Sequence, residues 1–245
     1  MAILTRDKLA SYGVELLVVV FGILIAFQVD EWREDRQRSR NLDAALNRLA
    51  EETAGNLQYC EQIIPVQAQH AQSVLTVARV LNDGRLDDED VEAFEAGLTR
   101  VGYVTGGPYS TSVAAEMIAT GLLKDLDNAE LRNRVAELPV WIDGVRNWDH
   151  EYRNSLGAAV AEVAEAVDLE LPDDFEMPAY TEGPATGFED SIRVRYVFEE
   201  LVANRSLKNV FIEAADTHLD MWRNHQGVCR KLEGIRASLS AMNRR

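Results

Sequence analysis

The feature that most constrains this chain is an apolar stretch near its start, Leu9 to Val29 (LASYGVELLVVVFGILIAFQV), whose only charged side chain is Glu15. As a helix this stretch is about 31 Å long at roughly 1.5 Å per residue, which matches a hydrocarbon core of about 30 Å. Tyr12 and Trp32 bracket it as interface anchors, at the spacing of aromatic residues at the two membrane surfaces. The sequence therefore predicts one N-terminal transmembrane helix.

Two other interpretations of this stretch stay open. Its uninterrupted apolar part, residues 16–27, is short enough to be the core of a cleaved signal peptide or a buried helix of a globular domain. However, no A-x-A cleavage pattern follows it, and no nearby cysteine follows it for lipoprotein processing. A membrane anchor explains the pattern better than either alternative.

Polar and small residues inside the stretch are candidate contact residues. An ionisable side chain within a span is a functional hypothesis by default. Glu15 has three possible roles: solvation at headgroup depth, a contact with another helix, or proton or ion handling. Gly22 and Ala26 form a small-xxx-small pair that allows two spans to pack closely, and Gln28 adds a polar contact group.

This segment also resembles a known family. Tyr12, then Glu15-Leu-Leu-Val-Val-Val-Phe-Gly22-Ile-Leu-Ile-Ala26-Phe-Gln28, then Trp32 is similar to the start of a family of uncharacterised bacterial single-span membrane proteins of unknown function, with the pattern G-E-I-x-L-V-V-I-G-I-L-I-A-L-Q and then a tryptophan. The glycine of that pattern is displaced here to Gly13. A weaker similarity covers Ala119-Thr-Gly121-Leu-Leu and Asn128-Ala-Glu-Leu131-Arg. The resemblance implies a membrane location and no activity.

The membrane would then be the bacterial inner (cell) membrane, crossed once. A literal Lys/Arg count favours a cytoplasmic C-terminal side, since two basic residues precede the span and four arginines follow it closely: Arg6 and Lys8, then Arg33, Arg36, Arg38 and Arg40. Against this count, a short N-terminal tail before an uncleaved span is commonly kept in the cytoplasm. We therefore expect the C-terminal domain to be periplasmic or external, and the cytoplasmic alternative stays open.

The charge of the chain limits its partners. The formal net charge is −16, and the charged residues of the first 29 positions cancel, so the excess of acid lies in residues 30–245. Such a domain repels phosphate backbones, which argues against nucleic-acid binding. The lipid bilayer, a second copy of the chain or another membrane protein are the expected partners.

Helical patterns continue from the span almost to the end of the chain. We expect an N-terminal tail (1–8), the span (9–29), a stalk helix (30–64) ended or kinked at Pro65, a helical region (65–169), a Pro-rich loop (170–188) and C-terminal helices (189–245) that pack back on the stalk. Within the helical region, one helix should run from Asn128 to about Val167, with a kink at Pro139. The predicted fold is all-α: a transmembrane helix that continues into an acidic antiparallel bundle.

Two heptad seams, typical of coiled coils, support this bundle. The stalk seam alternates steps of four and three residues: Leu42, Leu46, Leu49, Thr53, Asn56, Cys60 and Ile63. The last helix keeps the same alternation: Leu207, Phe211, Ala214, His218, Met221, His225, Val228, Leu232, Ile235, Leu239 and Met242. His218 and His225 are polar members of this seam, and they either set its register or form a pH-responsive or metal-binding pair.

Pairing the two seams antiparallel places Leu49 opposite Leu239 and Cys60 opposite Val228 and Cys229. Cys60 and Cys229 are the two cysteines of the chain, without the spacing of a zinc site. A disulfide between them is possible and would form in an exported domain, whereas both thiols would stay reduced in the cytoplasm.

No motif for catalysis, a metal or a cofactor stands out, and an enzyme is disfavoured. Trp148-Asp149-His150-Glu151 places a histidine between two carboxylates, but neighbouring helical positions point about 100° apart, so we interpret the run as a solvated face. The sequence predicts a membrane-anchored, non-enzymatic interaction or assembly protein, either an oligomer or an accessory subunit. The alternative is a membrane-anchored ligand-sensing domain that acts through a partner protein.

Overall fold

The computed structural model describes residues 6–173 and 192–242, and the side chains among them from Val19 onward. Within these ranges the chain is mainly helical, and the elements follow in the order α1 (Arg6–Asp83), η1 (Asp88–Asp90), α2 (Val91–Arg100), α3 (Ser112–Ala119), η2 (Leu122–Asp125), α4 (Ala129–Ser155), α5 (Gly157–Ala166), β1 (Asp168–Glu170), β2 (Arg193–Arg195), α6 (Phe198–Ala203) and α7 (Arg205–Met242). The expected all-α bundle is confirmed.

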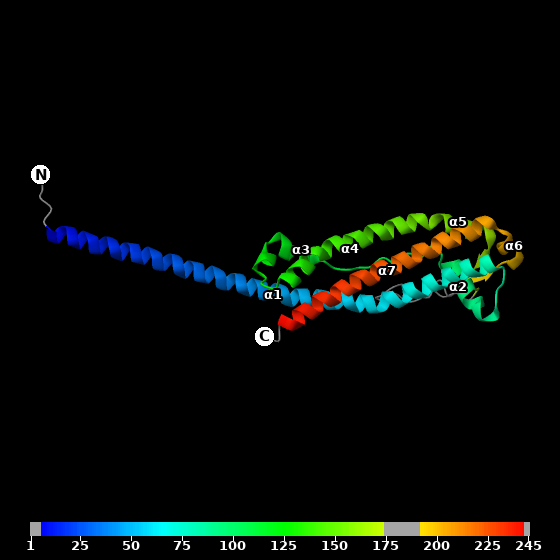
Figure 1. The fold of residues 1–245 in the computed structure, drawn as a ribbon, viewed down its shortest axis with the longest axis horizontal. Coiled ribbons are helices and arrows are strands. Elements are labelled where there is room, and N and C mark those ends of the chain that lie inside the picture. The colour runs from blue at the N-terminus through cyan, green and yellow to red at the C-terminus, as the bar shows by residue number, and fades with distance from the viewer. Residues whose placement is uncertain (1–5, 174–191, 243–245) are drawn as a thin grey trace.

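Helix α1 gives the molecule its elongated shape. Its N-terminal part, residues 6–41, projects as a lone rod, and its C-terminal part forms one side of the bundle (Figure 1). Helix α7 runs back along α1, and its end lies where the rod leaves the bundle (Figure 1). Side chains 19–41 are all exposed, and the first buried residue is Ala45. The rod therefore lies outside the hydrophobic core of the bundle.

The predicted boundary at Pro65 is wrong, because Pro65 lies inside α1 and residues 66–81 continue the same helix. Proline removes one backbone hydrogen bond, to the carbonyl of Glu61. Both residues are exposed, so water can satisfy this carbonyl, while buried Ile63 and Gln67 hold the helix against the bundle on either side. The helix ends where the Asn82-Asp83-Gly84 signal predicts: Gly84 has φ +67° and donates its N–H to the carbonyl of Val80.

Two further features differ from the sequence prediction. The helix expected from Asn128 to Val167 is interrupted at Leu156, which separates α4 from α5, while Pro139 lies inside α4. Strands β1 and β2 pair antiparallel, with Leu169 opposite Val194. Beyond residue 173, the Pro-rich loop predicted for 170–188 lies outside the described residues.

The two seams form the core as predicted. On α1, the seam from Leu49 to Ile63 is buried, and Leu42 and Leu46 are partly buried. On α7, the seam from Leu207 to Leu239 is buried, and Met242 packs against it. Leu49 shares the first hydrophobic cluster with Leu239, and Val77 shares the second with Phe211, so the two helices run antiparallel.

The hydrophobic core has two parts. The proximal cluster, nearer the rod, includes Leu49, Leu57, Val145 and Leu232. The distal cluster includes side chains from the far end of α1, from α2 and α5 and from the start of α7, among them Val77, Phe94, Val163 and Phe211.

The rod carries most of the predicted transmembrane stretch. Within the part of the chain whose structure is described, no helix is both long enough and apolar enough to cross a membrane. Tyr12 and Glu15 lie outside the residues whose side chains are described.

Candidate functional site

A belt of buried polar side chains lies between the two hydrophobic clusters, and we call it the polar layer. Along α1 and α7 it lies between the residues that belong to the proximal cluster and those that belong to the distal cluster. Its members come from α1, the 101–111 loop, α4 and α7: Gln67, His70, Thr105, Tyr109, Asp149, His218 and His225. All of them are less than a tenth exposed, so their polar atoms need partners inside the protein.

A chain of hydrogen bonds runs through this layer. His225 Nε2 lies 3.2 Å from Asp149 Oδ1, and His225 Nδ1 lies 3.0 Å from the Tyr109 hydroxyl. Since a carboxylate only accepts, His225 donates from Nε2 to Asp149, and with the proton on Nε2 the other ring nitrogen, Nδ1, can accept from the Tyr109 hydroxyl. Burial raises the pKa of Tyr109, so its hydroxyl keeps the proton that this bond requires. The chain ties α4, α7 and the 101–111 loop together.

The 101–111 loop is held in place by further polar contacts. Arg146 Nη2 donates to the carbonyl of Tyr109 at 2.6 Å, and the Tyr59 hydroxyl donates to the carbonyl of Gly106 at 3.0 Å. Burial, with the nearby Asp149 carboxylate, raises the pKa of Tyr59 to about 12. A Cβ on Gly107 would collide with the ring of Tyr109, so glycine is required there for close approach.

His218 occupies the distal side of the polar layer. Its Nε2 donates to the carbonyl of Val101 at 2.9 Å, and burial lowers its pKa. Nearby, Gln67 donates from Nε2 to the carbonyl of Thr105 at 3.2 Å. Among the described residues, Gln67 Oε1 and His218 Nδ1 meet no hydrogen-bond partner. Such buried atoms are typical positions for ordered internal water.

A disulfide lies at the proximal edge of the polar layer. Cys60 of α1 and Cys229 of α7 are bonded, with Cα atoms 5.9 Å apart and a sequence separation of 169 residues. The Tyr109 hydroxyl lies 4.0 Å from Cys229 Sγ. The bond therefore joins the two long helices beside the hydrogen-bonded chain of Asp149, His225 and Tyr109.

A second group of polar contacts attaches α3 to α1. The Glu52 carboxylate accepts from the hydroxyls of Ser110 and Ser112 at 2.6 and 2.7 Å, and from the backbone N–H of Val113 at 3.1 Å. Burial by itself would raise the pKa of the Glu52 carboxyl. The hydrogen bonds to the carboxylate outweigh burial, so the pKa is lowered. Asn56 exchanges two 2.8 Å hydrogen bonds with the backbone of Ser110. Glu52 thus caps α3 from another helix.

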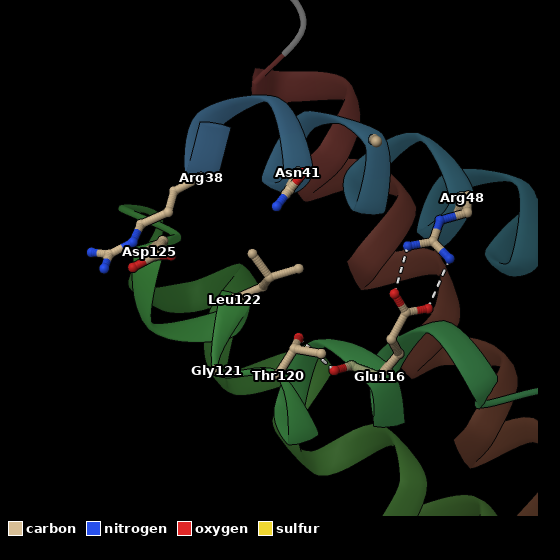
Figure 2. A pocket seen from close by; sticks show the side chains of 9 residues that line it. Arg38, Asn41, Arg48, Glu116, Thr120, Gly121, Leu122 and Asp125 are labelled. Atoms are coloured by element: carbon tan, nitrogen blue, oxygen red, sulfur yellow. Dashed lines mark hydrogen bonds and ion pairs between the residues drawn. The ribbon is translucent and has the colours of Figure 1, made fainter. Parts of the chain in front are cut away.

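Beside this attachment lies a hollow between α1 and the α3–η2 corner (Figure 2). Its volume is about 550 Å³. At one end Arg48 and Glu116 form a two-bond ion pair of 2.7 and 2.8 Å, and Arg38 and Asp125 lie at the other end. Asn41 and Leu122 project into the space between (Figure 2). The lining combines both signs of charge, which suits a small polar ligand better than an apolar one.

The structure places the other site residues predicted from sequence on the rod. Gly22, Ala26 and Gln28 are exposed there, and Trp32 is 59 % exposed. Arg36 stacks over the Trp32 ring at 5.4 Å from its centroid. The structure does not bring these residues together with the polar layer.

Sequence reasoning singled out His218 and His225 but missed their partners. The interpretation of Trp148-Asp149-His150-Glu151 as a solvated face is wrong for Asp149, which is 5 % exposed, whereas His150 is exposed. The sequence does contain a pattern that indicates the burial of Asp149. Asp149 lies four residues after Val145, on the buried face of α4. In the described ranges, no group of three or more histidine, cysteine or acidic side chains is arranged to hold a metal ion.

Comparison with known proteins identifies a family. No curated protein and no solved structure matches the chain. One family model matches residues 15–139, which is half of the chain and includes most of the rod, both sides of the hollow and the 101–111 loop. The chain therefore belongs to DUF6090, a family of unknown function.

Proposed function

We propose that this protein is a membrane-anchored, non-enzymatic assembly protein whose rod lies in a bilayer as far as Val29 and whose bundle is held outside it. The observation that carries this proposal is the apolar surface of the rod. Phe21, Ile25 and Phe27 are 60, 62 and 68 % exposed, and their large apolar neighbours from Val19 to Val29 are at least 41 % exposed. A continuous exposed apolar surface of this kind marks a membrane or protein interaction site.

The bundle supports an assembly role rather than catalysis. The best-connected polar group, formed by Asp149, His225 and Tyr109, is buried, and its hydrogen bonds fix the packing of α4 and α7. The disulfide holds α7 to α1. A rigid body at the end of a stiff helix is suited to presenting a surface at a defined distance from the membrane. Its proposed location is periplasmic or external, where a disulfide persists.

Extraction of native membranes tests the anchor. We expect the full chain to stay in the pellet through alkaline carbonate and 1 M salt and to be released by detergent. The variant Leu24→Arg with Ile25→Arg should be released by carbonate, because each charge in a span is strongly unfavourable. The matched control, Ile118→Arg with Ile212→Arg, changes exposed apolar residues of the bundle and should stay in the pellet. Release of the unaltered chain by carbonate would contradict the proposal.

The hollow of Figure 2 supports a second candidate, a ligand-sensing domain that acts through a partner. A small polar molecule bound there would contact α1 and the α3–η2 corner together. Mass spectrometry of protein purified in mild detergent should then detect a retained small molecule. Asn41→Trp, which fills the hollow, should abolish its retention, and Gln37→Trp on the exposed helix should not. Absence of any retained molecule from the unaltered protein counts against this candidate.

A further inference from the structure

The charged side chains of α1 just beyond its apolar stretch are segregated by face. With roughly 100° of rotation per residue, Arg33, Arg36 and Arg40 fall within about 60° of arc. We call this the basic stripe. The acidic stripe lies on the opposite side of the helix and consists of Asp30, Glu31, Glu34 and Asp35. All of these side chains are exposed on the rod. Arg38 lies within the acidic stripe and is bonded to Glu34 at 3.9 Å.

This arrangement is unfavourable for an isolated helix. Like charges stand four residues apart at Asp30 and Glu34, at Glu31 and Asp35, and at Arg36 and Arg40, and such pairs destabilise a helix. Alternating the same residues would create attractive pairs instead. Lipid headgroups do not explain the segregation either, because they surround a single helix on every side. A neighbour that approaches from one side does explain it.

The small residues of the rod share the face of the basic stripe. Gly22 and Ala26 fall in about the same sector as Arg33, Arg36 and Arg40, and a Cβ on Gly22 would meet nothing. On the side of the acidic stripe the rod presents large apolar residues, including Leu24 and Phe27, which are 53 and 68 % exposed. Large apolar side chains also lie near the basic stripe, among them Val29, which is 41 % exposed, so the two faces differ chiefly in charge.

We propose that α1 binds a second copy of this chain head-to-tail, with the basic stripe and the Gly22–Ala26 face of one copy against the acidic stripe and Phe27 face of the next. This inference rests on the proposed membrane anchor, because a shared bilayer keeps the copies parallel. A head-to-tail contact uses two different surfaces of each copy, so every copy can bind a further one. Parallel copies in one membrane can then close into a ring of more than two.

Charge reversal tests this contact in detergent-solubilised full-length protein. Native mass spectrometry or light scattering should give more than two copies for the unaltered chain. Two reversed variants should each fall to one copy: Arg33→Glu, Arg36→Glu and Arg40→Glu in the first, and Glu31→Lys, Glu34→Lys and Asp35→Lys in the second. The chain with both sets of changes should regain the assembly, because its stripes are exchanged and remain complementary.

Two comparisons separate this contact from other effects of charge. The control Arg153→Glu, Arg230→Glu and Arg236→Glu makes the same charge change at exposed bundle positions and should keep the assembly. Co-expressed first and second variants should co-purify, whereas tagged and untagged copies of either variant alone should not. The proposal is overturned if the unaltered chain is monomeric or dimeric, or if the exchanged chain does not assemble. It is also overturned if assembly depends on the basic stripe alone, because that result would indicate binding to an anionic lipid. Carbonate extraction of the same variants should leave them in the pellet, which keeps failure of the ring distinct from failure of the anchor.

Discussion

His225 of α7 and Asp149 of α4 are joined inside the bundle, with 3.2 Å between Nε2 and Oδ1 and with side chains that are 0 and 7 % exposed. They lie 76 residues apart in the chain. The other ring nitrogen of His225 is held by Tyr109 at 3.0 Å. Because water does not reach this pair, each partner depends on the other for its hydrogen bond.

Asp149→Ala should lower the free energy of unfolding by about 1–3 kcal/mol, because it leaves the buried Nε2–H of His225 without an acceptor. Asp149→Asn keeps an acceptor oxygen and should lower the free energy of unfolding by less than Asp149→Ala does. Glu151→Ala, at an exposed position of the same helix, should change stability by no more than about 0.5 kcal/mol. Urea unfolding measures all three. Equal effects of Asp149→Ala and Glu151→Ala would show that the pair contributes nothing.

His218 should make stability depend on pH. Burial lowers its pKa below the ordinary 6.5, so the unfolded chain binds a proton more readily than the folded chain does. The stability that the neutral His218 ring contributes is therefore fully present above pH 6.5. It is lost as the pH falls through 6.5 toward the folded-state pKa of His218. His218→Gln should reduce the loss of unfolding free energy between pH 7.5 and pH 5, measured by urea titration at each pH. The exposed control His150→Gln should leave this loss unchanged. A loss in His218→Gln as large as in the unaltered chain would refute the prediction.

Glu52→Gln should loosen α3 from α1. The change removes a charge that accepts from Ser110, Ser112 and the N–H of Val113, and we expect a loss of about 1–2 kcal/mol. Since the pKa of Glu52 is lowered in the folded protein, its contribution is present above pH 4.5 and disappears as the pH falls toward the folded-state pKa. Hydrogen exchange should show faster exchange in residues 112–119. The exposed neighbour Glu51→Gln is the control, and identical exchange in both variants would count against this capping role.

Removal of the disulfide should destabilise the bundle. The bond spans 169 residues, and a closed loop of that length contributes about 5 kcal/mol in the chain-entropy model, which is an upper value in practice. The double variant Cys60→Ser and Cys229→Ser should unfold at lower urea concentration than the oxidised chain. Reductant should lower the urea midpoint of the unaltered chain by a similar amount, and it should leave the urea midpoint of the double variant unchanged. Two free thiols in protein trapped by acid from native membranes would show that the bond does not form in the cell.

Local patterns in the sequence determine the helices and the surfaces they bury. The seams of α1 and α7 follow from a spacing of hydrophobic residues that places one face of each helix in the core, and this holds for Leu49 and Leu239 as predicted. The end of α1 at Gly84 also follows locally, because glycine adopts the positive φ that closes a helix. These features depend only on residues within a few turns of each other.

Tertiary structure alone decided the continuation of α1 through Pro65, the burial of Asp149 and the capping of α3 by Glu52. The local preference of proline to break a helix is outweighed by packing on both sides of it. Asp149 and Glu52 look like ordinary surface acids in sequence, because their partners Tyr109, His225 and Ser110 lie far away along the chain. Hydrogen bonds between distant segments depend on how the helices are placed relative to one another, and a one-dimensional spacing pattern carries no information about that placement.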